Sequence, residues 1–309
     1  MDTTTETKTE EARIVLKGLE DGKYIVNVGK VSDELTPGFY KYDQKGANGL
    51  VYIKQSVAPD RLVLDLDQQR VVNKVLAFFG ERELYQKMDI RHRRGIFMYG
   101  DPGTGKTTII KAIMMMVIAR GGIVLNMSHT FRELPVAIKM ARKNTDTPIL
   151  VVSEDIETLL AGNNGGASSM REMLNMQKAT SRDRELTEVM DGLNGREMDN
   201  VLFLATTNFI DKIPGRLKNR PGRFDERIEI GYPSSESRAQ IVSDVGHGFI
   251  EEGQVEFLAE ISEKMTVAHI RELVIQSVIY KTPEKELRTM ADELRVFCAE
   301  SAREMRGEE

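Results

Sequence analysis

Runs of apolar residues alternate with helical patterns through the middle of the chain. Five of these runs are short and apolar throughout, and we expect them to form buried strands at residues 96–99, 123–125, 149–152, 201–204 and 228–230. Strands of this kind, separated by helices, are typical of a parallel sheet with helices on both faces. The pattern therefore predicts an α/β domain with a five-stranded parallel sheet over residues 61–232.

The two ends of the chain follow different patterns. Residues 12–60 alternate short apolar runs with turn dipeptides such as Asp21-Gly22, which predicts a small β-rich N-terminal domain. Residues 1–11 are rich in Thr and Glu and nearly free of apolar side chains, so we expect a disordered tail. Apolar positions recur with helical spacing over residues 233–309, which predicts a C-terminal helical lid domain.

Composition and charge narrow the classes of protein. The 309 residues carry 43 Lys and Arg against 48 Asp and Glu, a net charge of -5 that provides no global attraction to nucleic acid or anionic lipid. No run approaches the ~20 apolar residues of a membrane span, and the N-terminus lacks the pattern of a secretory signal. We therefore expect a cytoplasmic protein without membrane contact. The single cysteine, Cys298, excludes an intrachain disulfide and is expected to pack in the lid.

The strongest local motif is GDPGTGKT at residues 100–107, between an expected strand and an expected helix. It fits the phosphate-binding pattern G-x-x-x-x-G-K-[ST]. Its glycines let backbone N–H groups turn toward a β-phosphate, and Lys106 would bridge the β- and γ-phosphates. Thr107 would ligate magnesium. The motif predicts binding of ATP and Mg²⁺, with nucleotide contacts from Asp101, Pro102, Gly103, Thr104, Gly105, Lys106, Thr107 and Thr108.

Two acids, Glu154 and Asp155, directly follow the apolar run at residues 149–152 and Ser153. The carboxyl ends of parallel strands form the ligand edge of such a sheet. Phosphoryl transfer depends mainly on positioning and charge neutralisation, so acids are needed at this edge. We expect Glu154, with Thr107, to serve the metal and Asp155 to polarise the attacking water. The alternative is a pair of solvated acids that cap the next helix.

Two further segments identify a family. The strand at residues 201–204 is followed by ATTN, ending at Asn208, and residues 219–225 read NRPGRFD. Together with the phosphate-binding motif and the acids, these segments resemble the AAA family of ATPases. The resemblance implies that Asn208 senses the γ-phosphate and that Arg220 and Arg223 reach the site of a neighbouring subunit. A planar guanidinium is suited to neutralise phosphate oxygens in the transition state.

The resemblance continues into the lid. Residues 265–273 (MTVAHIREL) are similar to the F-S-G-A-D-L segment of the family, which implies that Ala268 contacts the nucleotide. His269 replaces the usual acid, and we expect it to pack rather than to catalyse. Within the family, residues 78–95 and the order Glu154-Asp155 are most similar to the branch of mitochondrial ATPases that translocates the folded Rieske iron–sulfur protein. We expect no membrane helix of that branch here.

One segment departs from the AAA unfoldases. Residues 126–135 lack the aromatic-apolar-glycine motif that grips an extended polypeptide, and Phe131 is expected to be a buried residue at the start of a helix. The Gly-, Asn- and Ser-rich loop at residues 161–169 forms either a second pore loop or a surface insertion. No H-E-x-x-H motif is present, which excludes an attached metalloprotease.

Three functions compete. The first is a homo-oligomeric ring of six or seven copies that hydrolyses ATP at subunit interfaces to remodel or translocate a protein partner, as a chaperone does. The second is an ATP-driven switch or motor on nucleic acid, and the third is a mainly structural oligomer stabilised by nucleotide. The missing basic stripe disfavours the second. The intact acids and arginines disfavour the third.

Overall fold

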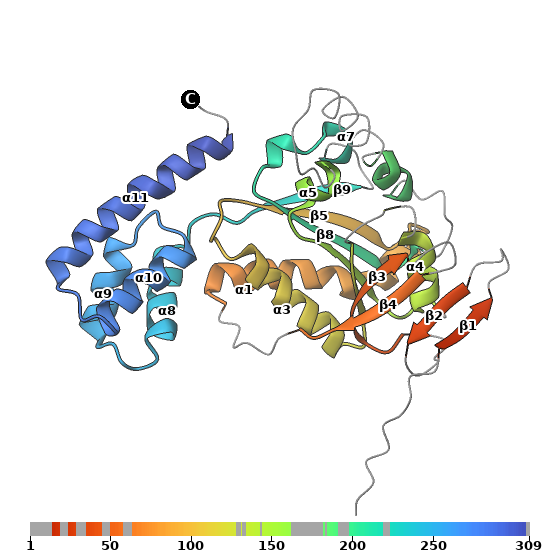
Figure 1. The fold of residues 1–309 in the computed structure, drawn as a ribbon, viewed down its shortest axis with the longest axis horizontal. Helices are drawn as coiled ribbons and strands as arrows, with labels where there is room; N and C mark the ends of the chain where they lie inside the picture. The colour runs from red at the N-terminus through yellow and green to blue at the C-terminus, as the bar shows by residue number, and fades with distance from the viewer. Residues whose placement is uncertain are drawn as a thin grey trace, which may run out of the picture.

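The computed structural model of the protein describes residues 14–18, 24–28, 35–44, 50–57, 64–127, 131, 134–142, 144–161, 182, 184–190, 198–218 and 223–306. Within this part of the chain a central sheet is flanked by helices, and a group of C-terminal helices lies at one end of that sheet (Figure 1). The expected disordered tail at residues 1–11 lies outside the described residues.

The main sheet contains seven strands in the order β4-β3-β6-β7-β8-β5-β9. Only the pair β3 and β4 is antiparallel, and every other neighbouring pair is parallel. The predicted α/β fold with a parallel sheet is therefore confirmed. The strands are β3 (Gly38–Gln44), β4 (Leu50–Gln55), β5 (Arg93–Tyr99), β6 (Ile123–Asn126), β7 (Ile149–Ser153), β8 (Val201–Thr207) and β9 (Phe224–Glu229).

The sheet is two strands larger than the five expected from the sequence. β3 pairs in parallel with β6, with Gly38 opposite Ile123, and β4 then pairs with β3. This addition satisfies backbone hydrogen-bonding groups along the outer edge of β6 that a five-stranded sheet would leave unpaired. The strands β1 (Ile14–Gly18) and β2 (Tyr24–Val28) form a separate antiparallel pair. A domain boundary at residue 60 stays a prediction.

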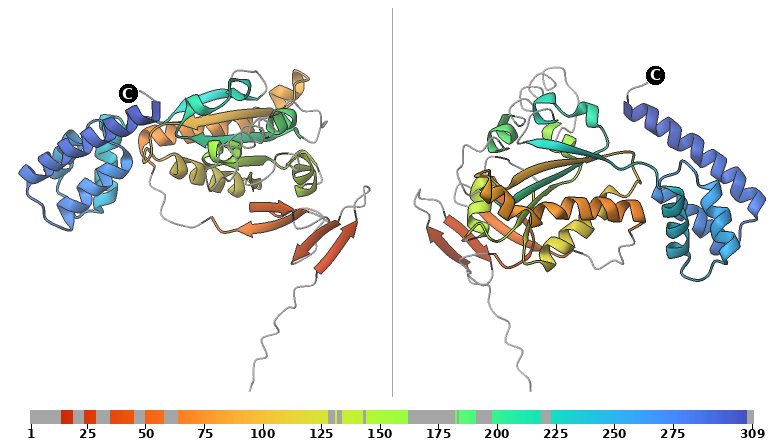
Figure 2. Two further views of the ribbon diagram at one scale, coloured as in Figure 1. Left: turned by 45° about the horizontal axis from the view of Figure 1, so that its top comes forward. Right: turned by 180° about the vertical axis from the view of Figure 1, so that it is seen from behind.

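Helices cover both faces of the sheet, and each face has its own core (Figure 2). One face packs against α1 (Leu66–Ala77) and α3 (Lys106–Ala119), where Val75 and Ile113 are fully buried. The other face packs against α4 (Leu134–Ala141) and α5 (Ile156–Ala161). The alternation of strand side chains divides the two cores, since Phe97 faces α4 and α5 whereas Ile96 and Met98 face α3.

The remaining short elements connect these layers. They are the 3₁₀ turns η2 (Phe78–Gly80) and η4 (Ile210–Lys212) and the helices α2 (Arg82–Lys87) and α7 (Gly215–Lys218).

Four helices near the C-terminus, which we call the helical lid, share a third core. They are α8 (Ser235–Gly246), α9 (Glu252–Ile261), α10 (Val267–Val278) and α11 (Glu284–Arg306). Val242, Ile270 and Leu287 are buried between them. The lid follows β9 directly and lies next to the start of α1 (Figures 1 and 2). Among the helices of the described residues, none is both long enough and apolar enough to cross a membrane.

Candidate active site

The loop between β5 and α3 has the shape of a phosphate cradle. Gly103 and Gly105 adopt φ angles of +79° and +98°, which glycine reaches without steric cost. A Cβ atom on Gly105 would stand 2.2 Å from Nε2 of Gln68, so a larger residue there would displace this side chain. α3 begins immediately afterwards at Lys106. Its first backbone N–H groups lack partners within the helix and are suited to an anion.

Lys106 is held inside the cradle. Its side chain is buried, and Nζ donates hydrogen bonds of 2.7 Å to the carbonyl oxygen of Gly100 and 2.9 Å to that of Asp101. Burial lowers the pKa of the ammonium group below its ordinary value, while Asp155 and Asp101 act in the opposite direction. An ammonium group has three N–H donors, so one donor of Lys106 remains for a phosphate oxygen.

The two acids after β7 have different partners. Glu154 Oε2 accepts a hydrogen bond of 2.8 Å from Thr107 Oγ1, so the two residues expected to serve the metal are in contact. A carboxylate and a hydroxyl oxygen fit Mg²⁺, which takes one or two protein carboxylates and obtains its other ligands from water and phosphates. The described residues contain no group of three or more His, Cys, Asp or Glu side chains that could form a protein-only metal cage. The donor set therefore fits magnesium bound together with a nucleotide.

Asp155 faces the end of the neighbouring strand instead. Its Oδ1 accepts a long hydrogen bond of 3.5 Å from Nδ2 of Asn208, and its backbone N–H donates to Thr206 Oγ1 over 3.3 Å. Asp155 has a φ of +46°, a left-handed conformation that few residues other than glycine adopt. The carboxylate at this turn faces Asn208. β7 and β8 thus bring together two predicted site residues from distant parts of the sequence.

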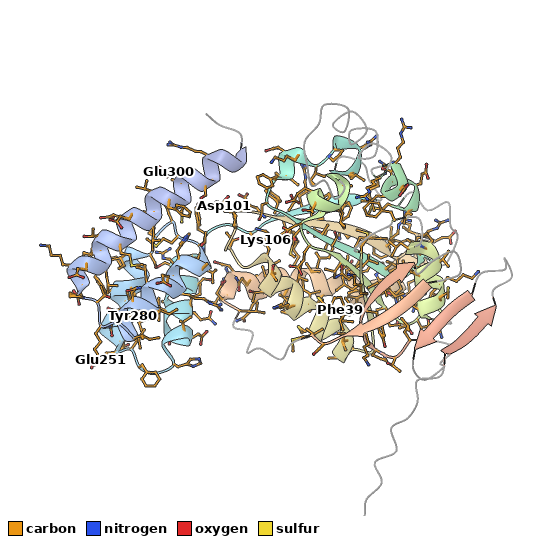
Figure 3. All side chains as sticks on the ribbon, viewed as in Figure 1. Phe39, Asp101, Lys106, Glu251, Tyr280 and Glu300 are labelled. Carbon is orange, nitrogen blue, oxygen red and sulfur yellow. The ribbon has the colours of Figure 1, made fainter. Side chains whose placement is uncertain are left out.

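These groups surround one cavity of about 500 Å³, a volume within the range of small-molecule sites. Among the residues predicted from the sequence, its lining contains Pro102, Gly103, Gly105, Lys106, Thr107, Thr108, Asp155, Asn208 and Ala268. Figure 3 shows Asp101 and Lys106 at the end of the sheet that faces the lid.

Three predicted residues lie beside this cavity rather than in its lining. The Asp101 carboxylate accepts a hydrogen bond of 2.9 Å from the Tyr232 hydroxyl group, and Thr104 is buried with its hydroxyl group on the Asp101 carbonyl oxygen. Glu154 lines an adjacent cavity of about 380 Å³.

The lid closes one side of the main cavity. The backbone N–H of Ala268 donates to the Gly103 carbonyl oxygen over 3.2 Å, and a Cβ atom on Gly103 would stand 3.1 Å from Cβ of Ala268. Only small residues permit this approach. His269 packs against Phe297 and has Nδ1 3.1 Å from Sγ of the buried Cys298. Burial lowers the pKa of His269. His269 and Cys298 thus have packing positions in the lid.

Comparisons with known proteins agree with this geometry. Residues 96–232 match the model of the ATPase family associated with various cellular activities (AAA). This segment is similar to AAA ATPase domains, and we call it the AAA domain. A proteasome-activating nucleotidase of Methanopyrus kandleri is 26% identical over an alignment of 332 positions. The alignment covers 94% of this chain and 71% of that protein.

Two other relatives match a smaller part of their own length. A cell division cycle protein 48 homolog of Archaeoglobus fulgidus is 28% identical, over 64% of this chain and 26% of that protein. An "AAA ATPase forming ring-shaped complexes" of Bifidobacterium adolescentis is 30% identical, over 58% of this chain and 36% of that protein. The regions shared with these two relatives cover about a quarter to a third of the relatives' own length.

The arginines expected to act between copies of the AAA domain are placed only in part. Arg220 lies outside the described residues. Arg223 is 3% exposed, and its guanidinium group donates to the backbone carbonyl oxygen of Arg216 within the same chain. In this single copy, the described contact of Arg223 is therefore with its own chain. The trans role of both arginines stays a prediction.

The segments expected near a central opening are described only in part. Phe131 is buried just before α4 begins at Leu134, as its sequence context indicated. Residues 128–130 and 162–169 lie outside the described residues. The choice between a pore loop and a surface insertion for the second segment therefore stays open.

Four further residues near the cradle were not predicted from the sequence. Thr206, Val267 and Arg271 line the main cavity. Arg271 follows Ala268 by three residues on α10, so the helical repeat puts both on one face and provided a usable signal. Gln68 touches the cradle from α1, 36 residues before Thr104, and no local pattern indicates that contact.

Proposed function

We propose that this protein binds ATP with magnesium at junctions between copies of itself and hydrolyses it to remodel or move a protein partner. The observation that carries the proposal is the convergence of Lys106, the Thr107–Glu154 pair and the Asp155–Asn208 pair on one edge of the sheet. Phosphoryl transfer needs charge neutralisation and a positioned nucleophile, and this arrangement provides groups for both.

Each residue has a proposed role. The remaining N–H donor of Lys106 binds a phosphate oxygen, and Thr107 and Glu154 hold the cation. Magnesium, when bound, neutralises negative charge that develops on the phosphates. Asp155 polarises the attacking water, and the amide group of Asn208 holds the Asp155 carboxylate in place.

The relatives support an oligomer and a protein partner. One is named for ring-shaped complexes and another for the activation of a proteasome. We propose a ring of six or seven copies in the cytoplasm, in which Arg220 of one copy completes the site of the next. Net charge of -5 and the absence of a basic stripe in the sequence make a protein a better partner than nucleic acid.

The finer resemblance to the ATPases that translocate the folded Rieske protein concerns the kind of cargo. It is supported by the order Glu154-Asp155 and by residues 126–135, which lack an aromatic-glycine grip. These features favour folded cargo over an extended chain. Electron-microscopy class averages with ATP bound test this idea, because a ring with a wide central opening is expected and a narrow axial pore contradicts it.

The test of the proposed activity is the Lys106→Ala variant. The unmodified protein is expected to hydrolyse ATP only with magnesium, and Lys106→Ala is expected to abolish turnover. Lys285→Ala, which removes an exposed lysine in the first turn of α11, is the matched control and keeps the parent rate. Turnover by Lys106→Ala at the parent rate contradicts the site. Stimulation by nucleic acid that falls with salt, without stimulation by protein, contradicts the proposed partner.

A further inference from the structure

The first turn of α1 contacts the phosphate loop through Gln68. Nε2 of this residue donates to the carbonyl oxygen of Thr104 over 3.3 Å and lies against Gly105. Gln68 and Thr104 are both buried. A buried amide that bonds the loop backbone fixes the loop through a residue that is not part of the cavity lining.

The cap of α1 fixes the orientation of that amide. Asp65 accepts the backbone N–H of Gln68 over 3.0 Å, and Gln68 Oε1 accepts the backbone N–H of Asp65 over 3.4 Å. This reciprocal pair is a capping box. Because the amide oxygen faces Asp65, the amide nitrogen faces Thr104.

The neighbouring residue, Asp67, contacts the lid. Its Oδ2 accepts hydrogen bonds of 2.9 Å from the backbone N–H of Ser234 and 3.0 Å from the hydroxyl group of Ser237. Ser234 is the N-cap of α8, so the carboxylate lies where the helix dipole favours negative charge. Burial acts to raise the pKa of Asp67, but the bonds from Ser234 and Ser237 outweigh it, and the pKa is lowered. Gln240 of α8 adds a weaker bond of 3.4 Å to the Leu64 carbonyl oxygen.

The lid transmits this contact back to the cavity. α8 and α10 share the lid core, in which Val242 of α8 and Ile270 of α10 are fully buried. α10 carries Ala268, whose N–H bonds the Gly103 carbonyl oxygen, and Val267 and Arg271, which line the cavity. A shift of α8 away from α1 therefore moves the wall of the cavity that α10 forms.

We propose that Asp67 and Gln68 are positioning residues that hold the lid at a fixed angle to the phosphate loop and thereby set the affinity for nucleotide. The inference rests on the proposed binding of ATP. Through these two adjacent residues, α1 connects the phosphate loop to the lid. Gln68 bonds the loop and Asp67 bonds the lid. Neither side chain lines the cavity, so both act through other residues.

This connection from loop to lid predicts that KM and kcat respond differently when it is broken. When the lid is released, the nucleotide loses the wall formed by α10, while Lys106, Thr107 and Asp155 keep their positions on the AAA domain. Binding therefore weakens, and the rate at saturating ATP is retained. KM is expected to rise and kcat to change little, a pattern that a general loss of folded protein does not produce because that lowers kcat alone.

The experiment uses Asp67→Ala with Glu236→Ala as the matched control. Both acids are the second residue of a helix, in α1 and α8 respectively, but Glu236 is exposed and makes no bond to α1. Asp67→Ala is expected to raise the Kd and KM for ATP about tenfold, because the charge-assisted hydrogen bonds from Ser234 and Ser237 are lost. Glu236→Ala is expected to match the unmodified protein. Equal values for the two variants, or a fall in kcat at unchanged KM, overturn the inference.

Two double variants test the connection from loop to lid. Ser237→Ala removes the hydroxyl donor to Asp67, and Gln68→Met removes the donor to Thr104 without adding charge. Each of these variants is combined with Asp67→Ala. Each double variant is expected to have the same affinity for ATP as whichever of its two single variants binds ATP less tightly, because either change alone already breaks the connection between loop and lid. Fully additive effects overturn the inference. If the unmodified protein itself fails to bind ATP, the proposed function fails instead, and this control separates the two outcomes.

Discussion

Thr107 Oγ1 donates a hydrogen bond of 2.8 Å to Glu154 Oε2, which joins the first turn of α3 to the end of β7. The next acid, Asp155, has a different partner and faces Asn208 across 3.5 Å. Adjacent carboxylates in one turn thus face two different groups. The first carboxylate is paired with the hydroxyl group of Thr107 on α3, and the second with the side-chain amide of Asn208, which follows β8.

This division predicts different outcomes for two conservative variants. Asp155→Asn is expected to bind ATP with nearly unchanged affinity and to lose about 10²–10⁴ in kcat, the usual contribution of a general base. Glu154→Gln is expected to raise the magnesium concentration needed for binding. Titration with a fluorescent nucleotide and steady-state turnover measure both effects. If Asp155→Asn loses affinity while Glu154→Gln binds and stalls, the two roles are reversed.

A mixing experiment tests whether the site is shared between copies. Arg220→Ala is expected to bind ATP, because the phosphate cradle is intact, and to lose about 10³–10⁵ in rate, as removal of an arginine finger does elsewhere. A mixture with Lys106→Ala places an intact cradle beside an intact arginine at some junctions. Activity is expected to return in part.

A concentration series of the unmodified protein is the control for that mixture. Specific activity is expected to rise as copies associate. A mixture that stays inactive, together with specific activity that does not depend on concentration, contradicts a site shared between copies.

The lid arginine, Arg271, provides a prediction on affinity. It is exposed, it lines the main cavity, and it forms no hydrogen bond or ion pair with another described residue. A guanidinium group free to meet a phosphate oxygen contributes about 1.5–3 kcal/mol, so Arg271→Ala is expected to weaken ATP binding about tenfold or more. Isothermal titration measures the change. Arg303→Ala on the exposed side of α11 is the matched control, and equal affinities for the two variants count against a contact with nucleotide.

His92 predicts a dependence of stability on pH. The ring is fully buried and stacked on Phe78, with Nε2 2.8 Å from the Phe78 carbonyl oxygen and Nδ1 3.1 Å from Asn200 Oδ1. Burial lowers the pKa below 6.5, although both oxygens act to raise it. The unfolded chain therefore binds this proton more readily than the folded protein. The free energy of unfolding is expected to fall as the pH drops through about 6.5.

Denaturant unfolding between pH 5 and pH 8 measures this effect. His92→Gln keeps a hydrogen-bond donor but cannot titrate, so its stability is expected to depend less on pH than that of the unmodified protein. His269, whose pKa is also lowered, is retained in both proteins and contributes equally. Identical slopes for the two proteins contradict the assignment to His92.

The sequence predicted the central strands because strands covered on both faces are apolar throughout. Residues 149–152 and 201–204 illustrate this, and both lie in buried strands of the sheet. The addition of β3 to β6 was not predictable, since the alternation within a hairpin indicates strands but does not specify the edge to which they attach. The count of strands was therefore too low while the fold class was correct.

The site shows a similar division. Lys106 and Asp155 lie in motifs whose spacing reflects the chemistry, and both line the main cavity. Gln68 was missed because its contact with Thr104 depends on how α1 packs, which no short pattern encodes. The position of Arg223 was also beyond the motif, which does not indicate a contact with the carbonyl group of Arg216.

The pairing of β3 with β6 determines which strand forms this edge of the main sheet. Without β3, the border strand would be β6, whose Ile123, Val124 and Leu125 are apolar in sequence and prone to pair with strands of other molecules. With β3 and β4 in place, the border carries the exposed lysine Lys54. A charged side chain on an edge strand discourages edge-to-edge pairing with the sheets of other molecules. The β3–β4 hairpin thus covers the apolar edge of β6, and that edge is not open to strands of other molecules.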